Sequence, residues 1–258
     1  MSVAILCDIH GNLPALDAVL GEVANAGVDR IVVGGDIVPG PMPRQALDRL
    51  LTTDLPVQFV HGNGERSVLA QMAALQGAPV TYWGTTSGNP LPEKDQEIMR
   101  WTALQLGPDD ERLLASWPRT LTLDVEGLGK VLVCHATPRS ETEVFTRLTP
   151  EERLRPLLDG LGVALVVCGH THMPFDREVG STRVVNPGSV GMPFGEPGAY
   201  WALLGPRVEL KRTSYDLEQA AAAIRATSHP YADEQAREIL KPPAEQETLE
   251  LFESFAVS

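Results

Sequence analysis

Asp, Asn and His residues follow five short apolar runs of the sequence. Each run is of the kind that forms a buried strand, and in α/β proteins ligands gather at the carboxyl ends of such strands. We therefore expect these polar residues to share one site. They are Asp8 and His10 after Val3–Cys7, Asp36 after Ile31–Val33, Asn63 after Val57–Val60, His135 after Val131–Cys134, and His170 and His172 after Leu165–Cys168.

The side chains of this set favour a metal site. They offer carboxylate, carboxamide and imidazole groups without requiring a thiolate, and this mixture suits Mn, Fe or Zn better than a soft metal. Asp8 and His10, like His170 and His172, are two residues apart, so each pair shares one face of extended backbone. Seven donors are too many for one tetrahedral ion and enough for two adjacent ions. The set as a whole predicts a dinuclear metal centre.

The surrounding pattern predicts an α/β fold. In the first third of the chain, apolar runs alternate with helical patterns, which is typical of βαβ units around a parallel sheet. Later runs at Arg183–Val185, Tyr200–Leu204 and Val208–Arg212 predict strands of a second, antiparallel sheet. We expect a single domain over the whole chain, with a helical insertion at about 77–118 and an acidic helical C-terminal extension at about 213–258.

Composition and charge narrow the class of substrate. The formal net charge is −13, the pI is about 4.9, and the sequence has no basic run. Such a surface repels a nucleic-acid backbone, so we expect a small-molecule partner rather than DNA or RNA. No apolar stretch approaches the length of a membrane span, no signal-peptide core precedes the first predicted strand, and three cysteines do not make a disulfide framework. These features predict a cytoplasmic protein without a membrane partner.

The order of the motifs resembles that of the calcineurin-like metallophosphoesterase superfamily, in particular its bacterial and archaeal phosphodiesterase branch. The pattern of that family is Asp-x-His, Gly-Asp, Gly-Asn-His-Asp/Glu, a lone His and Gly-His-x-His. The resemblance extends from Val3 to about Gly191, and no motif covers the predicted insertion or tail. The matching segments are Asp8-Ile9-His10-Gly11-Asn12, Gly35-Asp36, Gly62-Asn63-Gly64-Glu65, His135, Gly169-His170-Thr171-His172 and Asn186-Pro187-Gly188-Ser189-Val190-Gly191.

The resemblance implies a four-layer α-β-β-α sandwich of two mixed sheets flanked by helices, and a metal-dependent phosphoric ester hydrolase. Two divalent ions, with manganese expected first and iron or zinc as alternatives, would lower the pKa of a shared water, and the hydroxide would attack phosphorus in line. The implied substrate is a small phosphate monoester or diester, with nucleotides among the candidates. The implied ligands are Asp8, His10, Asp36 and His172 for one ion and Asp36, Asn63, His135 and His170 for the other, with the two oxygens of Asp36 bridging and Asn12 hydrogen-bonding the phosphate.

Gly64 departs from the family pattern, because many members have at this position the histidine that protonates the leaving group. A positioned acid contributes ~10²–10⁴-fold to a rate. One hypothesis is that the substrate has a good leaving group, as in an activated diester or an anhydride. A second is that His61 replaces the missing acid. The third is a metal-bound scaffold that acts through protein contacts, as a retromer subunit of similar fold does; we disfavour it because every ligand position is filled.

A few residues are open to two interpretations. Arg139 either binds a substrate phosphate or forms a surface ion pair. Cys168 lies two residues before His170 and thus on the same face of the strand, so it either lines the site or belongs to the core. His229 lies in a Ser-His-Pro turn and is expected at the surface. Homo-oligomer formation through the insertion or the tail stays open.

Overall fold

The computed structural model describes residues 1–257, whose strands form two sheets of five strands each. The first sheet has the order β10-β9-β1-β2-β3 and the second the order β4-β5-β6-β8-β7, so β1 and β6 are the central strands. The strands are β1 (Val3–Leu6), β2 (Arg30–Val33), β3 (Val57–Phe59), β4 (Thr120–Val125), β5 (Gly129–Cys134), β6 (Leu165–Val167), β7 (Phe175–Val179), β8 (Thr182–Asn186), β9 (Ala199–Leu204) and β10 (Val208–Thr213).

Nine helices of the described residues flank these sheets. None of them is both long and apolar enough to span a bilayer. Several begin with proline in the first turn, where its missing N–H costs nothing. The helices are α1 (Leu13–Asn25), α2 (Pro43–Leu51), α3 (Asn63–Leu75), α4 (Glu93–Leu104), α5 (Pro108–Ser116), α6 (Glu151–Leu158), α7 (Leu217–Arg225), α8 (Ala232–Leu240) and α9 (Glu245–Glu253).

The first sheet is mixed, and its strand partners correct one expectation. β1, β2 and β3 are parallel, as the alternation of apolar runs and helical patterns predicts. β9 pairs antiparallel with β1, in the register Val3↔Leu204, and β10 extends that edge. The prediction that β8, β9 and β10 belong to a second, antiparallel sheet is therefore wrong, because only β8 lies in the second sheet. Alternating burial identifies the faces of a strand but does not select its neighbour.

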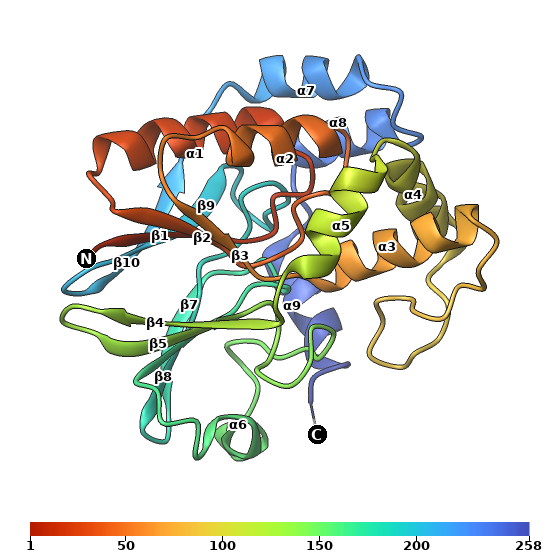
Figure 1. Cartoon of the computed structure of the whole chain (residues 1–258). Helices are drawn as coiled ribbons and strands as arrows, with labels where there is room; N and C mark the ends of the chain where they lie inside the picture. The colour runs from red at the N-terminus through yellow and green to blue at the C-terminus, as the bar shows by residue number, and fades with distance from the viewer. Residues whose placement is uncertain (258) are drawn as a thin grey trace.

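Alternation along the strands divides the core into layers. Val3 and Ile5 of β1 face the second sheet, whereas Ala4 and Leu6 pack with α1 and α2. On the far side, Leu154 of α6 packs on the outer face of the second sheet. Figure 1 shows the resulting order of helices, sheet, sheet and helix from top to bottom. The fold is thus the four-layer α-β-β-α sandwich that the motifs imply.

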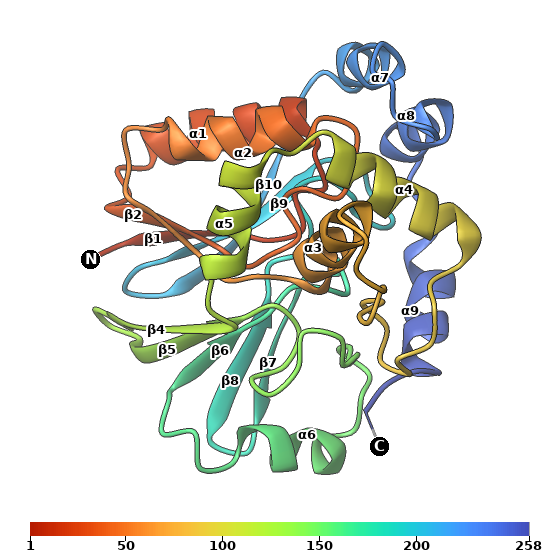
Figure 2. The ribbon, with the colours of Figure 1, turned by 45° about the vertical axis from the view of Figure 1, so that its right-hand side comes forward.

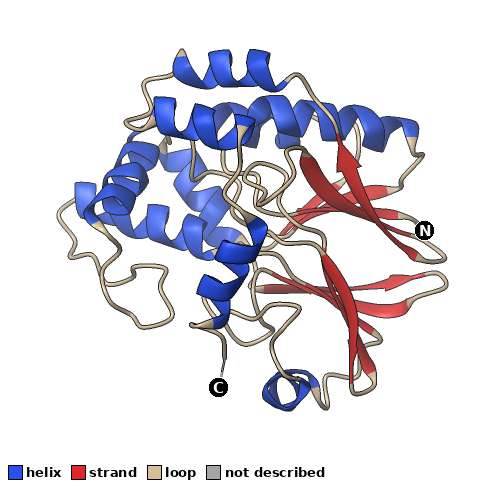
Figure 3. Ribbon diagram, turned by 180° about the vertical axis from the view of Figure 1, so that it is seen from behind, coloured by secondary structure: helices blue, strands red, loops and turns tan. Residues whose placement is uncertain are grey.

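The remaining helices gather on one side of the sandwich. α4 and α5, within the predicted insertion, pack on α3, and α7 packs on α8 in the predicted C-terminal extension. Seen from behind in Figure 3, the strands occupy one side of the molecule and these helices the other. In Figure 2, α4, α8 and α9 lie on the side toward which β1 and β2 run. The insertion and the extension therefore lie beside the strand ends that carry the expected ligands.

His229 corrects a second expectation, because it is buried, with 4% of its surface exposed. Its ring packs edge-on against Trp101 of α4, with the ring centroids 5.0 Å apart. Its Nδ1 accepts a hydrogen bond from the backbone N–H of Tyr231. The turn is present as the sequence predicts, but α4 covers it, and His229 connects the extension with the insertion.

Candidate metal centre

The carboxyl ends of β1, β2, β3, β5 and β6 meet at one edge of the two sheets, and the polar residues that follow them come together there. Nε2 of His172, after β6, lies 3.4 Å from Oδ1 of Asp8, after β1, and 3.2 Å from Nε2 of His10. Nε2 of His135, directly after β5, lies 2.8 Å from Oδ1 of Asn63, which begins α3. Residues far apart in the chain thus form one polar cluster.

Three of the histidine rings have a fixed tautomer. Burial lowers the pKa of His10 and His172 to about 4, so each of these rings is neutral at pH 7 and has a single N–H. When Nδ1 donates that hydrogen to a backbone carbonyl, Nε2 keeps its lone pair directed into the cluster. The Nδ1 partners are the carbonyls of Pro39 for His10 (3.1 Å), Gly34 for His135 (2.9 Å) and Met192 for His172 (2.7 Å).

Acceptor atoms consequently face one another with no hydrogen between them. This holds for the Nε2 atoms of His10 and His172, and for Nε2 of His135 with Oδ1 of Asn63, whose amide nitrogen donates to a loop carbonyl. Oδ1 of Asp8 is buried without any hydrogen-bond partner in the described part of the chain. Lone pairs held this close repel each other unless a cation lies among them. Imidazole nitrogens with carboxylate and amide oxygens fit Mn, Fe or Zn.

Asp36 lies between two groups of donors. Its Oδ2 is 3.9 Å from Nε2 of His10 and 3.6 Å from Nε2 of His135. Its Oδ1 accepts a hydrogen bond from the backbone N–H of Gly64 at 2.8 Å. Oδ2 alone therefore faces both groups, whereas the sequence suggested that the two oxygens share this role. Two groups have ligand atoms that all lie within 4.8 Å of one another, namely Asp8, His10 and His172, and Asp8, Asp36 and His135. Asp8 is thus common to both groups, and Asp36 extends from the second group to His10 of the first.

His170 lies at the margin of the cluster. Its ring packs edge-on against His135, with centroids 5.0 Å apart, but it belongs to neither of the two groups. Its backbone N–H donates to Oδ2 of Asp8 at 3.0 Å. The structure thus brings six of the seven expected ligands into mutual proximity and places the seventh beside them.

The backbone is strained at the expected ligands. Within the described residues, five residues other than glycine have a positive φ, and all five belong to the expected ligand set. The left-handed conformation costs an ordinary residue ~1–2 kcal/mol and persists where the surrounding structure enforces it, often at functional sites. The five are Asp8 (55°), His10 (48°), Asp36 (53°), His170 (67°) and His172 (58°).

Glu65 holds the loop that carries Asp36. This buried carboxylate accepts hydrogen bonds from the backbone N–H groups of Gly62 (2.8 Å), Asp36 (2.8 Å), Ile37 (2.6 Å) and Val38 (3.3 Å). Four donors on one carboxylate fix the start of α3 against the loop after β2. Sequence reasoning gave Glu65 no role, although Gly62-x-x-Glu65 has the spacing of a helix N-terminal capping pair.

The segment Asn186–Gly191 ties the loops of the two sheets together. The side-chain amide of Asn186 donates to the carbonyl of Gly169 at 2.7 Å. The hydroxyl of Ser189 and the N–H of Gly191 both donate to the carbonyl of Asp8, at 2.7 and 3.0 Å. The segment therefore sets the distance between the loop after β1 and the loop after β6.

The protonation of the buried carboxyls of Asp8 and Asp36 depends on what surrounds them. Burial raises the pKa of Asp8 to about 7, and burial likewise raises the pKa of Asp36 to about 6. A bound divalent cation reverses this balance, because it stabilises the carboxylate form. The two carboxyls thus need a cation to remain fully ionised in this cluster near pH 7.

Asn12 is engaged by protein partners. Its Oδ1 accepts from the N–H of Ala15 at 3.2 Å and caps α1, while its Nδ2 donates to the carbonyl of Gly191 (3.0 Å) and the hydroxyl of Tyr215 (3.3 Å). The phosphate contact expected of Asn12 would have to replace one of these bonds. The geometry gives this residue a positioning role next to the cluster.

The position of Gly64 has no room for a side chain. A Cβ atom there would lie 2.4 Å from Cγ of Pro39 and 2.7 Å from Oδ1 of Asp36. A histidine in this place would displace the Asp36 loop. The close packing of the Asp36 loop therefore requires glycine at position 64, and this explains why the acid is missing.

His61, the expected substitute acid, lies among other charges. It is half-buried, its Nδ1 has no hydrogen-bond partner in the described chain, and its pKa is lowered by burial and by Arg66 and Arg119, while Glu141 raises it. The same Glu141 accepts hydrogen bonds from Arg66 and from the hydroxyl of Tyr82. His61 thus lies within a cluster that fixes the loop before α4.

Arg139 forms a surface ion pair, and Cys168 lies in the core. Arg139 is exposed and forms an ion pair with Glu143, with Nε 2.8 Å from Oε1. Cys168 is buried in the core, and its thiol lies 3.7 Å from the carbonyl oxygen of Val185. Neither side chain lines the pockets found at the metal-ligand cluster.

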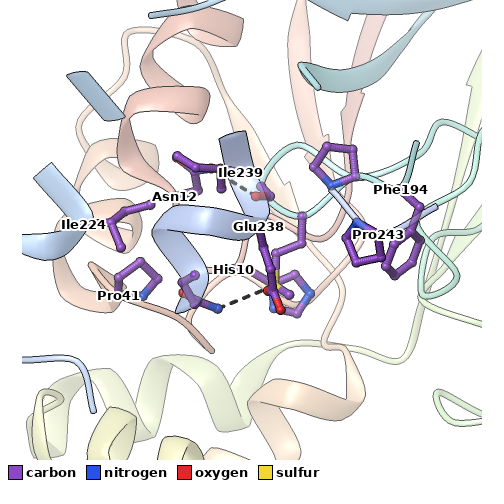
Figure 4. A pocket seen from close by; sticks show the side chains of 12 residues that line it. His10, Asn12, Pro41, Phe194, Ile224, Glu238, Ile239 and Pro243 are labelled. Atoms are coloured by element: carbon purple, nitrogen blue, oxygen red, sulfur yellow. Dashed lines mark hydrogen bonds between the residues drawn. The ribbon is translucent and has the colours of Figure 1, made fainter. Parts of the chain in front are cut away.

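Two pockets border the cluster on different sides. One, beside His10, has a volume of about 120 Å³ and is walled by the segment after Gly191 and by α7 and α8 (Figure 4). The other, beside His170, has a volume of about 510 Å³ and is lined by the loop at Gly84 and by Phe252 of α9. No pattern in the sequence pointed to these walls, because they depend on how the insertion and the extension fold back onto the sheets.

The chain matches one protein family in sequence and several proteins in sequence or fold. A sequence model described as the calcineurin-like phosphoesterase superfamily domain matches residues 1–205. The uncharacterized protein MJ0912 of Methanocaldococcus jannaschii is 28% identical over 242 residues, which are 86% of this chain and 91% of that protein. A metallophosphoesterase from Sphaerobacter thermophilus has a TM-score of 0.70 at 25% identity, covering 94% of this chain and 99% of its own. The hypothetical protein PH1004 from Pyrococcus horikoshii shares the fold, with a TM-score of 0.76 at 20% identity and the same coverage.

Proposed function

The chain belongs to the calcineurin-like phosphoesterase superfamily, and we propose that it hydrolyses a small phosphate ester with two divalent metal ions. The observation that carries the proposal is the set of facing acceptor atoms at the sheet edge. Oδ1 of Asp8 has no partner in the described chain, and the Nε2 lone pairs of three histidines point inward. A stable protein without bound cations gains nothing from such a cluster.

We propose that these residues form two metal sites that share Asp36, with Asp8 close to both. Oδ2 of Asp36 would belong to both sites, since it faces His10 and His135. When bound, the two cations would lower the pKa of a water molecule and neutralise the phosphoryl charge. The proposed ligands are Asp8, His10, Asp36 and His172 for one ion, and Asp36, Asn63, His135 and His170 for the other.

The chain's own groups hold this arrangement. Glu65 fixes the Asp36 loop through backbone N–H groups, and the carbonyl partners of the histidines keep Nε2 unprotonated. We further propose that the substrate has a good leaving group, because no side chain fits at Gly64 and His61 lies in the cluster of Arg66 and Glu141. An activated diester or an anhydride meets this condition, since such leaving groups depart without a strong acid.

Hydrolysis of two aryl substrates tests the proposal. The purified protein is assayed with bis(4-nitrophenyl) phosphate and with 4-nitrophenyl phosphate, in the presence of Mn²⁺ and after treatment with a chelator. We expect turnover of at least one ester, loss of turnover on chelation, and recovery when Mn²⁺ is restored. Turnover that persists in the chelated protein would contradict the metal requirement. An absence of turnover with metal bound would favour the scaffold that has lost its general acid.

A further inference from the structure

The pocket beside His10 is a candidate for the site that selects the substrate. His10 and Asn12 form its floor next to the metal-ligand cluster, and Ile224, Glu238 and Ile239 reach it from α7 and α8. Figure 4 shows the Glu238 side chain extending from its helix toward the His10 ring. A group that entered this pocket would therefore lie next to a phosphate bound at the cluster.

The walls and the volume of the pocket fit one ring. The walls are largely apolar, with the side chains of Met192, Phe194, Ile224 and Ile239 and the rings of three prolines. The cavity volume is about 120 Å³. A cavity of ~150 Å³ lined by aliphatic and aromatic side chains accommodates benzene. The pocket is slightly smaller than that cavity, so a single six-membered ring is the upper limit for a flat group in it, and a fused two-ring system exceeds this limit.

Glu238 is a polar lining residue of this pocket, alongside His10, Asn12 and Gln235. It is half-buried, and burial together with the nearby Glu234 raises the pKa of its carboxyl. Within the described residues its carboxylate takes part in no side-chain hydrogen bond and no ion pair, whereas Glu234 on the same helix pairs with Lys94. An acceptor in an apolar pocket gains most from a ligand that donates a hydrogen to it.

Several walls of the pocket come from outside the residues that match the superfamily. The match ends at residue 205, while Ile224, Gln235, Glu238 and Ile239 lie in the C-terminal extension. The metal ligands lie within the matched part. Residues that form a pocket beside a shared reaction centre, without belonging to it, are placed to distinguish one ester from another.

We infer that this pocket binds the ester substituent of the substrate, and that the substituent is a single ring with an N–H or O–H donor on the edge that faces Glu238. The inference rests on the proposed phosphoesterase function. This pocket admits pyrimidine-like and substituted phenyl rings and excludes purine-sized groups. The ring faces would contact Phe194 and Ile239, and the carboxylate of Glu238 would accept the hydrogen bond.

Binding of four phosphonates to the Mn²⁺-loaded protein tests the inference. They are methylphosphonate, benzylphosphonate, (4-aminobenzyl)phosphonate and (2-naphthylmethyl)phosphonate, measured by titration calorimetry. We expect benzylphosphonate to bind more tightly than methylphosphonate. The amino compound should bind about tenfold more tightly than benzylphosphonate, because it can form a hydrogen bond to a charged group. The naphthyl compound should bind no better than methylphosphonate, because its two rings do not fit the pocket.

Two variants and a control assign the effect to the pocket. Glu238→Met retains the length of the side chain but lacks the acceptor, so the amino compound should bind no better than benzylphosphonate. Ile239→Trp should fill the cavity and reduce benzylphosphonate to the affinity of methylphosphonate. Glu218→Met, an exposed position of α7, should change neither preference.

The outcomes separate this inference from the proposed function. Equal affinity of all four phosphonates, in a protein that hydrolyses aryl esters with Mn²⁺, would overturn the pocket inference and leave the function standing. An amino preference that survives in Glu238→Met would overturn the role of Glu238. If no phosphonate binds and no ester is hydrolysed, the proposed function fails and the inference fails with it.

Discussion

The metal-ligand edge of the sheets and the C-terminal extension differ in the strain of their backbone and in the partners of their polar groups. At the edge, five residues adopt a left-handed backbone, and buried acceptors face one another. In the extension, the chain forms regular helices, and their polar contacts with the rest of the protein include surface ion pairs such as Lys94–Glu234 and Arg147–Glu245. Surface pairs of this kind contribute ~0–1 kcal/mol each.

The difference supports the proposed division of roles, in which the edge carries out the chemistry and the extension selects the substrate. Strain and unpartnered acceptors reduce the stability of the folded protein, and they persist only where another interaction offsets them, which here would be the proposed bound cations. The extension has no comparable strain in its described residues. Substitutions at the edge should therefore affect activity and stability together, whereas those in the extension should alter preference or pH response.

The largest effect is expected for Asp36→Asn. Because Oδ2 of Asp36 faces both donor groups, the variant should lose more than ~10³-fold of the activity, beyond the ~10–100-fold typical of a residue that only orients a ligand. Initial rates with the aryl diester measure this loss. Asp124→Asn, at an exposed position of β4, is the matched control and should retain full activity. A rate for Asp36→Asn within tenfold of the wild type would contradict the bridging role.

Glu65→Gln should have the next largest effect. The amide retains one acceptor oxygen but directs N–H groups at backbone donors, so we expect a loss of ~1–3 kcal/mol in the free energy of unfolding. Activity should fall ~10–100-fold, because Glu65 holds the loop of Asp36. Urea unfolding and initial rates provide the two readouts. An unchanged free energy of unfolding and an unchanged rate would show that the Asp36 loop keeps its conformation without Glu65.

Gly64→His should destabilise the protein rather than restore an acid. The new Cβ would lie 2.4 Å from Pro39, so overpacking should cost ~1–3 kcal/mol and lower the rate for esters with poor leaving groups as well as good ones. Gly21→Ala, in the middle of α1 with open space at its Cβ, is the contrasting variant and should gain ~0.5–1 kcal/mol. A faster reaction of poor leaving groups in Gly64→His would overturn this account of the loop.

The smallest effect concerns the pH dependence of stability in the extension. Burial and Lys94 lower the pKa of His229 to about 4, below the value of ~6.5 for an unfolded histidine. The unfolded chain therefore binds the proton first, and stability should fall as the pH drops from about 6.5 to about 4. In His229→Gln this decline should be shallower by up to ~1.4 kcal/mol per pH unit, measured by urea unfolding against the wild type. Parallel curves would contradict the buried, neutral state of His229.

The sequence predicted those features that depend on residue type and local order. The apolar runs identified β1, β2, β3, β5 and β6, and the donors that follow them lie at one edge of the two sheets. The partners of β9 and β10 were not predictable, because strand pairing depends on which edge is free in three dimensions. The same holds for Glu65, whose four partners lie on two separate loops, and for His229, whose ring packs against Trp101 of α4.

Metal content tests the central claim most directly. Elemental analysis of the wild type and of Asp36→Asn, after both have been supplied with Mn²⁺ and dialysed, measures the ions that the cluster retains. The account predicts about two equivalents of divalent metal per chain in the wild type and a marked loss in the variant, because Asp36 faces both groups of donors. A wild type that retains no metal, or a variant that still retains two equivalents, would contradict it.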